Sequence, residues 1–540
     1  MEFRVQWFRR IAALSATAFA FSVVTATEGV ARAADPASAD VAVPGAVADV
    51  ATSSPSSAAS GSPAPGSASE APQASPAPPV AQSENKPEPI GGVLGDFGDG
   101  ERSALLKKGL SLQSTFLTEA AGNITGGRPI GGNAVVRGTA NAGQFNFGFD
   151  EDFSKLFNSS AAGTLHFLLT SRIGSRIATT GVGSLISEQE IYGGGQTTRV
   201  TYLDYEQFLL DKKLSIRVGK QNEEDEFAVG STYWGGVNLY CSFQNNNFCG
   251  SPASFLYNNP GIPGSGRGSE GYIYYPGSEY AVRLKVSPTP DLYIQASAYQ
   301  ENPIVLSPSG GGYFGFKGGV GTEYPAEIGY TLRNRANEQV GNVRVGGFFD
   351  TSNVPDYRND LAGTILPSPN NNNASIQAGL ALVPTNQYTR GRSGGDVQVD
   401  HVLISKTGPH QGGLVFFGAF EYSDPNTSQI STEVSGGLVQ HGTFHGRPDD
   451  TIGLAFGNEN FNPRLQRLET SLEAAGYAIP YTSSEQAIEL NYTIQAGQGV
   501  VFRPNIQYVL NPYGQETRAI PGFTPARDSI VLGITGVISL

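Results

Sequence analysis

Sulfur-containing residues and long apolar runs are both rare in this sequence. Its 540 residues include two cysteines and one methionine, which is Met1. After residue 33, no segment reaches the roughly 18 uninterrupted apolar residues that a membrane-spanning helix requires. The sequence therefore predicts no transmembrane helix beyond the N-terminal region.

Histidine is also scarce, and the few histidines do not form a metal-binding pattern. They are His166, His401, His410, His441 and His445. On a strand, residues four apart such as His441 and His445 lie about 13 Å from each other, too far for one zinc ion. No nucleophile elbow or phosphate loop stands in a strand-then-helix context. We therefore predict no metal, no cofactor and no enzymatic activity.

Positive charge is in deficit. The chain contains 35 lysines and arginines against 48 aspartates and glutamates, a formal net charge of −13. Removal of residues 1–33 as a signal peptide would take away four arginines and two glutamates and leave a charge of −15. A nucleic-acid partner requires a basic surface, so the composition argues against one.

The first 90 residues fall into two compositional zones. Residues 1–10 are basic, residues 11–24 form an apolar run, and Ala31-Arg32-Ala33 fits a small-x-small cleavage site. This pattern predicts a signal peptide over residues 1–33, with a short membrane anchor as the alternative. Residues 34–90 are rich in Ala, Pro and Ser, which predicts a disordered periplasmic linker. Contact of this linker with the cell wall is one hypothesis, and an inert spacer is the other.

The stretch Tyr202–Gly230 carries the clearest structural pattern. Apolar and polar residues alternate on both sides of Asp211-Lys212-Lys213, and Leu214, Ile216 and Val218 share one face of the second arm. Alternation with a period of two indicates a strand with two chemically different faces. The two arms are so close in sequence that a tight hairpin must join them.

Similar alternating segments continue to the C-terminus. We expect sixteen strands, at 109–119, 141–151, 162–173, 198–209, 213–222, 278–287, 291–301, 327–335, 340–350, 395–405, 413–423, 431–443, 449–458, 485–496, 500–511 and 528–540. Each is near the ~10 residues that a tilted membrane-spanning strand needs. Just before the first strand, residues 101–108 predict a short helix that ends at Gly109.

The connections between these strands alternate in length. Most even-numbered ones are short and most odd-numbered ones are long, the brief connection near Asp424 being an exception. Such sorting is typical of a membrane barrel with short periplasmic turns and long extracellular loops. Closure of the barrel removes strand edges whose backbone groups lipid could not satisfy. Residues 91–540 are therefore expected to form an all-β, closed, antiparallel transmembrane β-barrel in outer-membrane lipid.

The polar faces of the strands indicate a water-filled channel. Ile488 and Leu490 flank Glu489, for example, and burying such a polar face in a dry core would cost several kcal/mol per unpaired group. The residues expected to line the channel and contact its solute are Asp204, Glu206, Arg217, Arg283, Lys285, Arg344, Glu421, Glu489, Gln495, Arg503 and Asn505. Any one of them could instead be an ordinary solvated wall residue.

Several stretches resemble the carbohydrate-selective porins, the OprB family. They are Leu94–Arg102, Lys108–Leu112, Gly122–Gly126, Tyr205–Gln207, Leu214–Lys220, Glu226–Ala228, Gly446–Asp450 with Gly453, Glu489–Tyr492, Arg503–Tyr508 and Asn511-Pro512. The resemblance implies a sixteen-stranded outer-membrane porin through which sugars diffuse. The chain departs from the pattern in ending on Leu540, where barrels of this kind usually end on an aromatic residue.

The long connection 223–277 is expected to fold into the channel. It carries Tyr233, Trp234 and Tyr240, followed by Cys241 and Cys249. Two cysteines this close together in an oxidising compartment predict a local disulfide, which would limit the motion of the loop. A loop that stays outside the barrel is the alternative.

The sequence thus predicts an outer-membrane porin that lets mono- and small oligosaccharides diffuse passively. A sugar channel needs many exchangeable hydrogen-bonding groups and binding weak enough for exit. A general or anion-preferring porin is the first alternative, and a structural barrel that anchors the envelope through residues 34–90 is the second. The choice between a monomer and a homotrimer is not settled by the sequence.

Overall fold

The structure is a computed structural model of the whole chain. It describes residues 92–97, 100–128, 137–159, 162–192, 196–228, 242–248, 275–307, 310–355, 388–405, 413–428, 430–474, 482–514 and 525–539. The predicted signal peptide (1–33) and linker (34–90) lie outside these residues.

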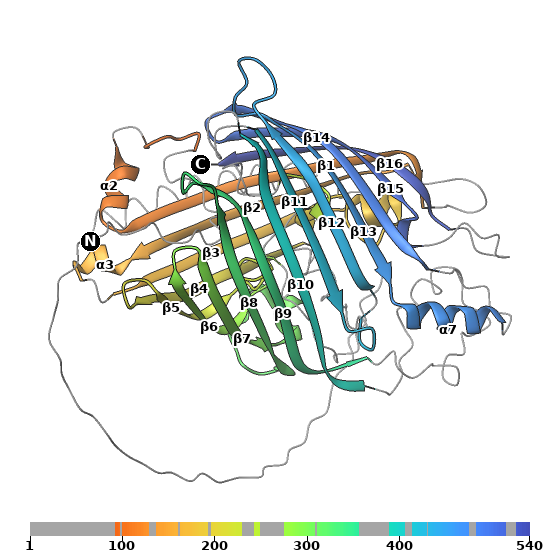
Figure 1. Ribbon diagram of the computed structural model, residues 1–540, viewed down its shortest axis with the longest axis horizontal. Coiled ribbons are helices and arrows are strands. Elements are labelled where there is room, and N and C mark those ends of the chain that lie inside the picture. Colours follow the sequence, from red (N-terminus) through yellow and green to blue (C-terminus); the bar gives the residue numbers. More distant parts are fainter. Residues whose placement is uncertain are drawn as a thin grey trace, which may run out of the picture. The chain divides into compact units, whose positions relative to one another are not determined.

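Sixteen antiparallel strands close into one barrel (Figure 1). They are β1 (Leu110–Gly127), β2 (Thr139–Asp152), β3 (Thr164–Gly174), β4 (Thr197–Leu209), β5 (Leu214–Gln221), β6 (Glu279–Thr289), β7 (Leu292–Glu301), β8 (Gly321–Arg333), β9 (Gln339–Pro355), β10 (Tyr388–Ser405), β11 (Gly413–Ser423), β12 (Ile430–His441), β13 (Thr451–Phe461), β14 (Ser484–Gly497), β15 (Val500–Leu510) and β16 (Arg527–Ser539). Each strand pairs with its neighbours in sequence, and β1 pairs with β16 to complete the ring. The predicted fold class, strand count and order are confirmed.

The largest boundary difference lies in β1. The sequence predicts its end at residue 119, because regular alternation stops in the glycine-rich stretch that follows. In the structure β1 continues to Gly127, since its backbone keeps pairing with β16, as in the pairs Gly122 with Leu532 and Asn123 with Val531. A strand of a closed barrel in lipid needs a partner for its backbone groups whatever its side chains are.

Helices are short and lie at strand ends. The predicted helix is present as α2 (Glu101–Lys107), directly before β1. The sequence did not indicate α3 (Phe153–Phe157), α5 (Pro303–Leu306) or α7 (Pro463–Ala474), or the single turns η2 (Ala178–Val182), η3 (Glu190–Tyr192), η5 (Asn246–Phe248), η6 (Gly310–Gly312) and η7 (Pro512–Gly514). Within the described residues, no helix combines the length and the apolar character needed to cross a membrane.

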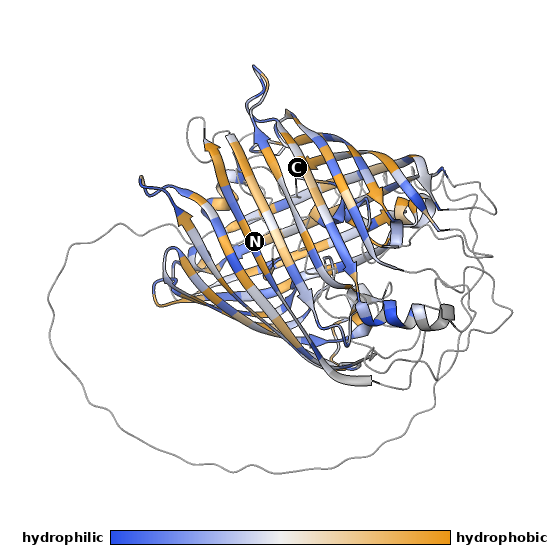
Figure 2. Ribbon diagram, turned by 45° about the vertical axis from the view of Figure 1, so that its right-hand side comes forward, coloured by the Kyte–Doolittle hydropathy of each residue, from blue (hydrophilic) through white to orange (hydrophobic). Residues whose placement is uncertain are grey.

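The outer face of the barrel is apolar. Hydrophobic and hydrophilic residues alternate along the strands, as Figure 2 shows by colour. Leu490 of β14 lies directly opposite Leu454 of β13 and Ile506 of β15, and all three side chains are nearly half exposed. Exposed apolar side chains in register across neighbouring strands form a continuous belt that suits contact with lipid.

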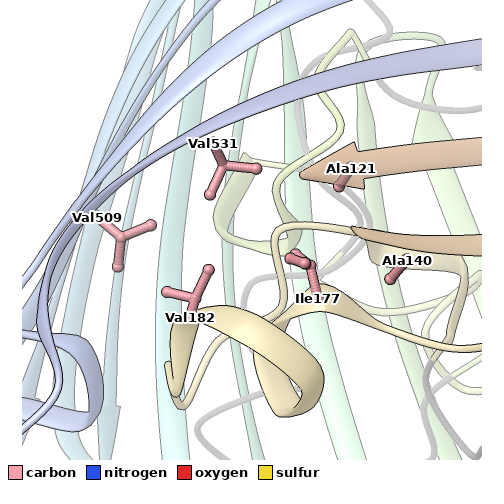
Figure 3. Packing of buried hydrophobic residues seen from close by; sticks show 6 residues of the cluster. All are labelled: Ala121, Ala140, Ile177, Val182, Val509 and Val531. Atoms are coloured by element: carbon pink, nitrogen blue, oxygen red, sulfur yellow. The ribbon is translucent and has the colours of Figure 1, made fainter. Parts of the chain in front are cut away.

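The buried apolar residues lie inside the barrel, where inserted loops meet the wall. Ile177 and Val182, in the connection between β3 and β4, pack against Ala121, Ala140, Val509 and Val531 of the strands (Figure 3). Phe243 and Phe248, in the connection between β5 and β6, pack in the same way against a cluster that includes Phe417. Apolar side chains thus fix two loops inside an otherwise polar lumen.

A charge placed in the outer belt is expected to destabilise the barrel. Leu490 lies in the middle of β14, so Leu490→Arg should reduce the free energy of unfolding in bilayers by about 2–4 kcal/mol. The matched control Leu490→Ala should reduce the free energy of unfolding much less. Denaturant unfolding of the protein in liposomes measures both changes, and equal stability of the two variants would contradict a lipid-facing Leu490.

Candidate functional site: the lumen wall and its inserted loops

The predicted channel residues lie on the inner side of the strands. Asp204 and Glu206 are buried on β4, for instance, whereas their neighbour Leu203 is exposed on the outside. Arg217, Arg283, Lys285, Glu421, Glu489, Arg503 and Asn505 are likewise buried, and Arg344 and Gln495 are half-buried. In a wide, empty barrel these side chains would be exposed to solvent. Their burial shows that inserted segments fill much of the lumen at these levels.

Two arginines and their carboxylates form the main charged cluster, on β4, β5 and β6. The Arg217 guanidinium binds Asp204 through two nitrogens, with Nε 2.5 Å from Oδ1 and Nη2 2.9 Å from Oδ2. Arg283 donates from Nη2 to Glu206 at 2.8 Å and from Nη1 to the Ser215 hydroxyl at 2.9 Å. Neighbouring strands in register place these residues side by side, since Glu206 lies opposite Arg217 and Arg217 opposite Arg283.

A residue outside the strands completes this cluster. Glu226 follows β5 and pairs with Arg217, and its other oxygen lies 3.3 Å from Arg283 Nε. Burial opposes ionisation of Glu226, but the nearby Arg283 and Arg217 outweigh it and hold its pKa below the ordinary value. The sequence offered one signal for this residue, because Glu226 belongs to the family-like stretch Glu226–Ala228.

A histidine extends the cluster toward β2 and β3. His166 Nδ1 lies 2.5 Å from Asp150 Oδ1, and His166 Nε2 lies 3.6 Å from Glu206 Oε2. His166 was not among the predicted channel residues. The sequence did place His166 on a strand with alternating faces. Its partners on β2 and β4 can be identified only from the register in which the strands pair.

Lys285 sits at the other edge of the cluster, above an aromatic ring. Its Nζ lies 4.2 Å from the centre of the Tyr293 ring, and the Tyr293 hydroxyl donates to Glu327 at 2.6 Å. The second Glu327 oxygen accepts from the Ala228 backbone N–H at 2.9 Å. Glu327 was missed because the predicted strand began at that residue, whereas β8 begins at Gly321.

On β14 and β15, the predicted channel residues hold a loop segment against the wall. Glu489 accepts from the backbone N–H groups of Gln244 (3.0 Å) and Asn245 (2.7 Å). Asn505 donates to Gln244 Oε1 at 2.7 Å. Arg503, two residues away on β15, donates from Nε to Thr493 Oγ1 at 2.9 Å. Residues 242–248 of the long connection 223–277 therefore lie against the inner face of the barrel.

The aromatic and cysteine residues of that connection lie outside the described residues. They are Tyr233, Trp234, Tyr240, Cys241 and Cys249. The proposed constriction by these aromatic side chains and the Cys241–Cys249 disulfide therefore remain predictions, although the described part of the same loop does contact the lumen wall.

A second inserted loop precedes β4. Glu485 of β14 accepts from the backbone N–H groups of Leu185 (2.7 Å) and Ile186 (2.9 Å). Glu188 follows in the same loop and is fully buried, with its Oε1 accepting from the Ser184 hydroxyl at 2.6 Å. Burial raises the pKa of Glu188 to about 8.

Of the three remaining predicted channel residues, Arg344 borders the charged cluster, whereas Gln495 and Glu421 belong to neither group. Arg344 on β9 hydrogen-bonds the Tyr293 side chain and lies within electrostatic range of Glu327 and Asp400. Gln495 lies near the turn end of β14, where its backbone N–H donates to Asp450 at 2.9 Å. Glu421 on β11 belongs to a row of carboxylates further along the wall. His445 lies in the turn after β12, outside the strand predicted at residues 431–443.

A closed barrel with an apolar outside, a polar lumen and loops folded into that lumen defines an outer-membrane porin. The family model described as "Carbohydrate-selective porin, OprB family" matches residues 136–539, and the chain belongs to this family. It is thus an outer-membrane porin for carbohydrates, and both family and fold are those of channels rather than enzymes.

Individual relatives match over most of their length. The chain is 29% identical to Porin B of Pseudomonas aeruginosa over 436 residues, which cover 78% of this chain and 87% of the relative. It is 25% identical over 441 residues to the putative porin QuiX of Acinetobacter baylyi. This match covers 78% of this chain and 89% of the relative. The high-pH structure of Pseudomonas putida OprB superposes with a TM-score of 0.70 at 24% identity, covering 83% of this chain and 98% of that structure.

The loop that carries Glu188 is expected to loosen at high pH. An acid whose pKa is raised in the folded state binds more protons when folded, so the stability of the folded loop falls as pH rises from about 4.5 through about 8. Single-channel current should therefore become larger or noisier between pH 6 and pH 9. Glu188→Gln should weaken this pH dependence of the single-channel current. If the variant has the same pH dependence as the unaltered protein, titration of Glu188 does not control the loop.

Proposed function

We propose that mono- and small oligosaccharides diffuse passively past the charged cluster, and that Asp204, Glu206, Arg217, Glu226 and Arg283 form the narrow part of the channel. Support comes from the burial of Asp204, Glu206, Arg217 and Arg283 at inward positions, with Glu226 half-buried beside them, since the same positions in an open pore would face water. Arg283 has no exposed surface, so it positions Glu206 and Glu226, whereas Arg217 keeps some exposure.

The charge balance of this cluster favours a neutral solute. Arg217 and Arg283 contact three carboxylates, those of Asp204, Glu206 and Glu226, and Lys285 lies close enough to Glu226 for their charges to interact. Among these six residues the positive and negative charges are equal in number. At the edges of the cluster, Asp150 and Glu327 add two carboxylates and Arg344 adds one positive charge. Paired ions still present N–H donors and carboxylate acceptors to hydroxyl groups, and they create no strong field that would favour an ion of one sign.

The same balance weighs against an anion-preferring porin, because such a channel needs basic side chains without carboxylate partners. Weak, exchangeable hydrogen bonds are what a diffusion channel requires, since a tightly bound sugar would not leave. We propose no covalent step and no catalytic residue.

The sugar preference is expected to depend on the two-pronged geometry of Arg217. Arg217→Ala removes a charged hydrogen-bonding group worth about 1.5–3 kcal/mol, so the ratio of sugar to amino-acid permeation should fall roughly tenfold. The same variant should shift ion selectivity toward cations. Arg217→Lys keeps the positive charge but cannot form the two-nitrogen contact with a carboxylate. It should therefore retain the ion selectivity and lose much of the sugar preference.

Liposome swelling with sugars, amino acids and ions of matched size, together with reversal potentials, measures both effects. Equal permeation of all matched solutes through the unaltered protein would favour a general porin. An Arg217→Ala variant that retains the full sugar preference would remove this cluster from the permeation path.

Two partner hypotheses from the sequence are retained as proposals. Association into a homotrimer is expected to give a detergent-corrected mass three times that of one chain, and a single-chain mass would exclude it.

Contact of residues 34–90 with the cell wall predicts that their deletion abolishes co-sedimentation with peptidoglycan while sugar uptake continues. Unchanged co-sedimentation would identify the segment as a spacer, and loss of uptake alone would contradict the wall-anchoring hypothesis.

A further inference from the structure

Half of the lysines of this chain gather at the short-turn end of five neighbouring strands. The sequence contains ten lysines, and five of them lie in or next to α2, in α3, and in the turn between β4 and β5. Figure 1 shows α2 and α3 at the same end of the barrel. All five side chains are exposed, and they are Lys107, Lys108, Lys155, Lys212 and Lys213.

Contacts between the turns make this set of lysines continuous. The Asp152 backbone N–H donates to the Gly109 carbonyl at 2.8 Å, and a Cβ added at Gly109 would meet Lys155 Cβ at 3.3 Å. Helix α3 therefore lies beside the end of α2. On its other side α3 contacts β4, because the Phe153 and Tyr205 ring centres are 6.2 Å apart. The turn that carries the last two lysines begins directly after β4.

Apolar side chains are exposed among these lysines. Leu210 is 72% exposed and Phe157 is 66% exposed, and Leu156 and Leu209 are exposed beside them. Leu210 has a φ of 52°, in the left-handed region that disfavours a bulky side chain, so neither burial nor backbone preference explains a leucine there. Large exposed apolar side chains that gather in one place mark a contact surface. We call the five lysines and these four apolar residues the basic rim.

The basic rim continues the lipid-facing surface of the barrel. Tyr205 lies on β4 between two lumen residues, so it faces outward, as the exposed Leu203 does. Leu209 follows in the same outward row. Phe157 is joined to Tyr205 through the ring of Phe153, with 5.6 Å between the two phenylalanine ring centres. The apolar part of the rim therefore lies where the outer belt ends, at the level of the lipid headgroups of the periplasmic leaflet.

The basic rim has an excess of exposed positive charge. The segments that contain it carry five exposed lysines against three acids, which are Glu101, Asp152 and Asp211. Within the described part of the chain, Lys155 is the one lysine of the rim that forms an ion pair, at 3.6 Å from Asp152. In another short turn, by contrast, Arg333 is paired with Asp291 at 2.5 Å. The rim thus offers positive charge to a partner outside the chain.

We propose that the basic rim binds anionic phospholipids of the periplasmic leaflet. Lysines close to a membrane surface attract anionic headgroups, and an ammonium group donates hydrogen bonds to phosphate oxygens. Exposed leucine and phenylalanine side chains contact the upper part of the acyl chains, which a free phosphate ion does not possess. The position of the rim at the edge of the outer belt brings both kinds of side chain to the same lipid molecule.

Native mass spectrometry of the full-length protein in detergent tests this proposal. Phosphatidylglycerol and phosphatidylethanolamine with identical acyl chains are the probes, and the unaltered protein should bind phosphatidylglycerol more tightly by roughly tenfold. The double variant Lys212→Gln/Lys213→Gln should lose most of this preference. The control Lys317→Gln/Arg335→Gln removes two exposed positive charges outside the rim and should bind both lipids as the unaltered protein does.

The apolar part of the rim has its own test. Leu210→Asn removes the apolar side chain and suits the left-handed backbone, so the turn should remain intact. This variant should bind both lipids several-fold more weakly and keep the preference between them. Excess glycerol phosphate should not displace bound phosphatidylglycerol from the unaltered protein, because the headgroup alone lacks acyl chains.

Three outcomes would overturn the proposal. The first is equal binding of the two lipids to the unaltered protein, or a preference that survives in Lys212→Gln/Lys213→Gln. The second is a lysine variant that shifts the reversal potential and leaves the lipid preference unchanged, since the lysines would then act at the channel mouth. The third is a variant that changes only the number of chains in the complex, which would assign the rim to contacts between copies of the chain.

Discussion

The need to pair every backbone amide inside the membrane determines the rest of this structure. Lipid offers no hydrogen bonds, so a chain that crosses it as strands must close into a ring, here by the pairing of β1 with β16. Closure gives every strand an inside and an outside. The outside takes the apolar residues that meet lipid. Many polar residues of the strands, such as Glu206 and Glu489, are directed to one shared lumen, where they must satisfy one another.

Inserted loops satisfy much of that polar lumen. Glu485 and Glu489 of β14 accept backbone N–H groups from two different loops, and apolar anchors such as Ile177 and Phe243 fix those loops on the wall. The same contacts narrow the channel, because a segment that satisfies a wall carboxylate must lie within about 3 Å of it. Stability and restricted permeation therefore have one physical origin in this barrel.

Charge is distributed unevenly around the lumen. On β4 to β6, arginines and carboxylates alternate across strands and neutralise one another, with Glu226 supplied from a loop. On β10 to β14 the facing residues Asp396, Glu421, Glu433, Glu459 and Glu485 are all acidic, and the loop that satisfies Glu485 does not reach Glu421 or Glu433. The first region suits a neutral hydroxyl-rich solute.

The sequence by itself determined the barrel, its strand number, its two faces and the inward position of Glu206, Arg217 and Arg283. These features follow from alternation and from the lengths of connections, which are local and can be read without knowing any contact. Only the tertiary structure decided that Glu226 pairs with both arginines and that residues 242–248 lie on β14. Such contacts join segments up to about 250 positions apart, and they depend on strand register and loop conformation, for which local periodicity carries no signal.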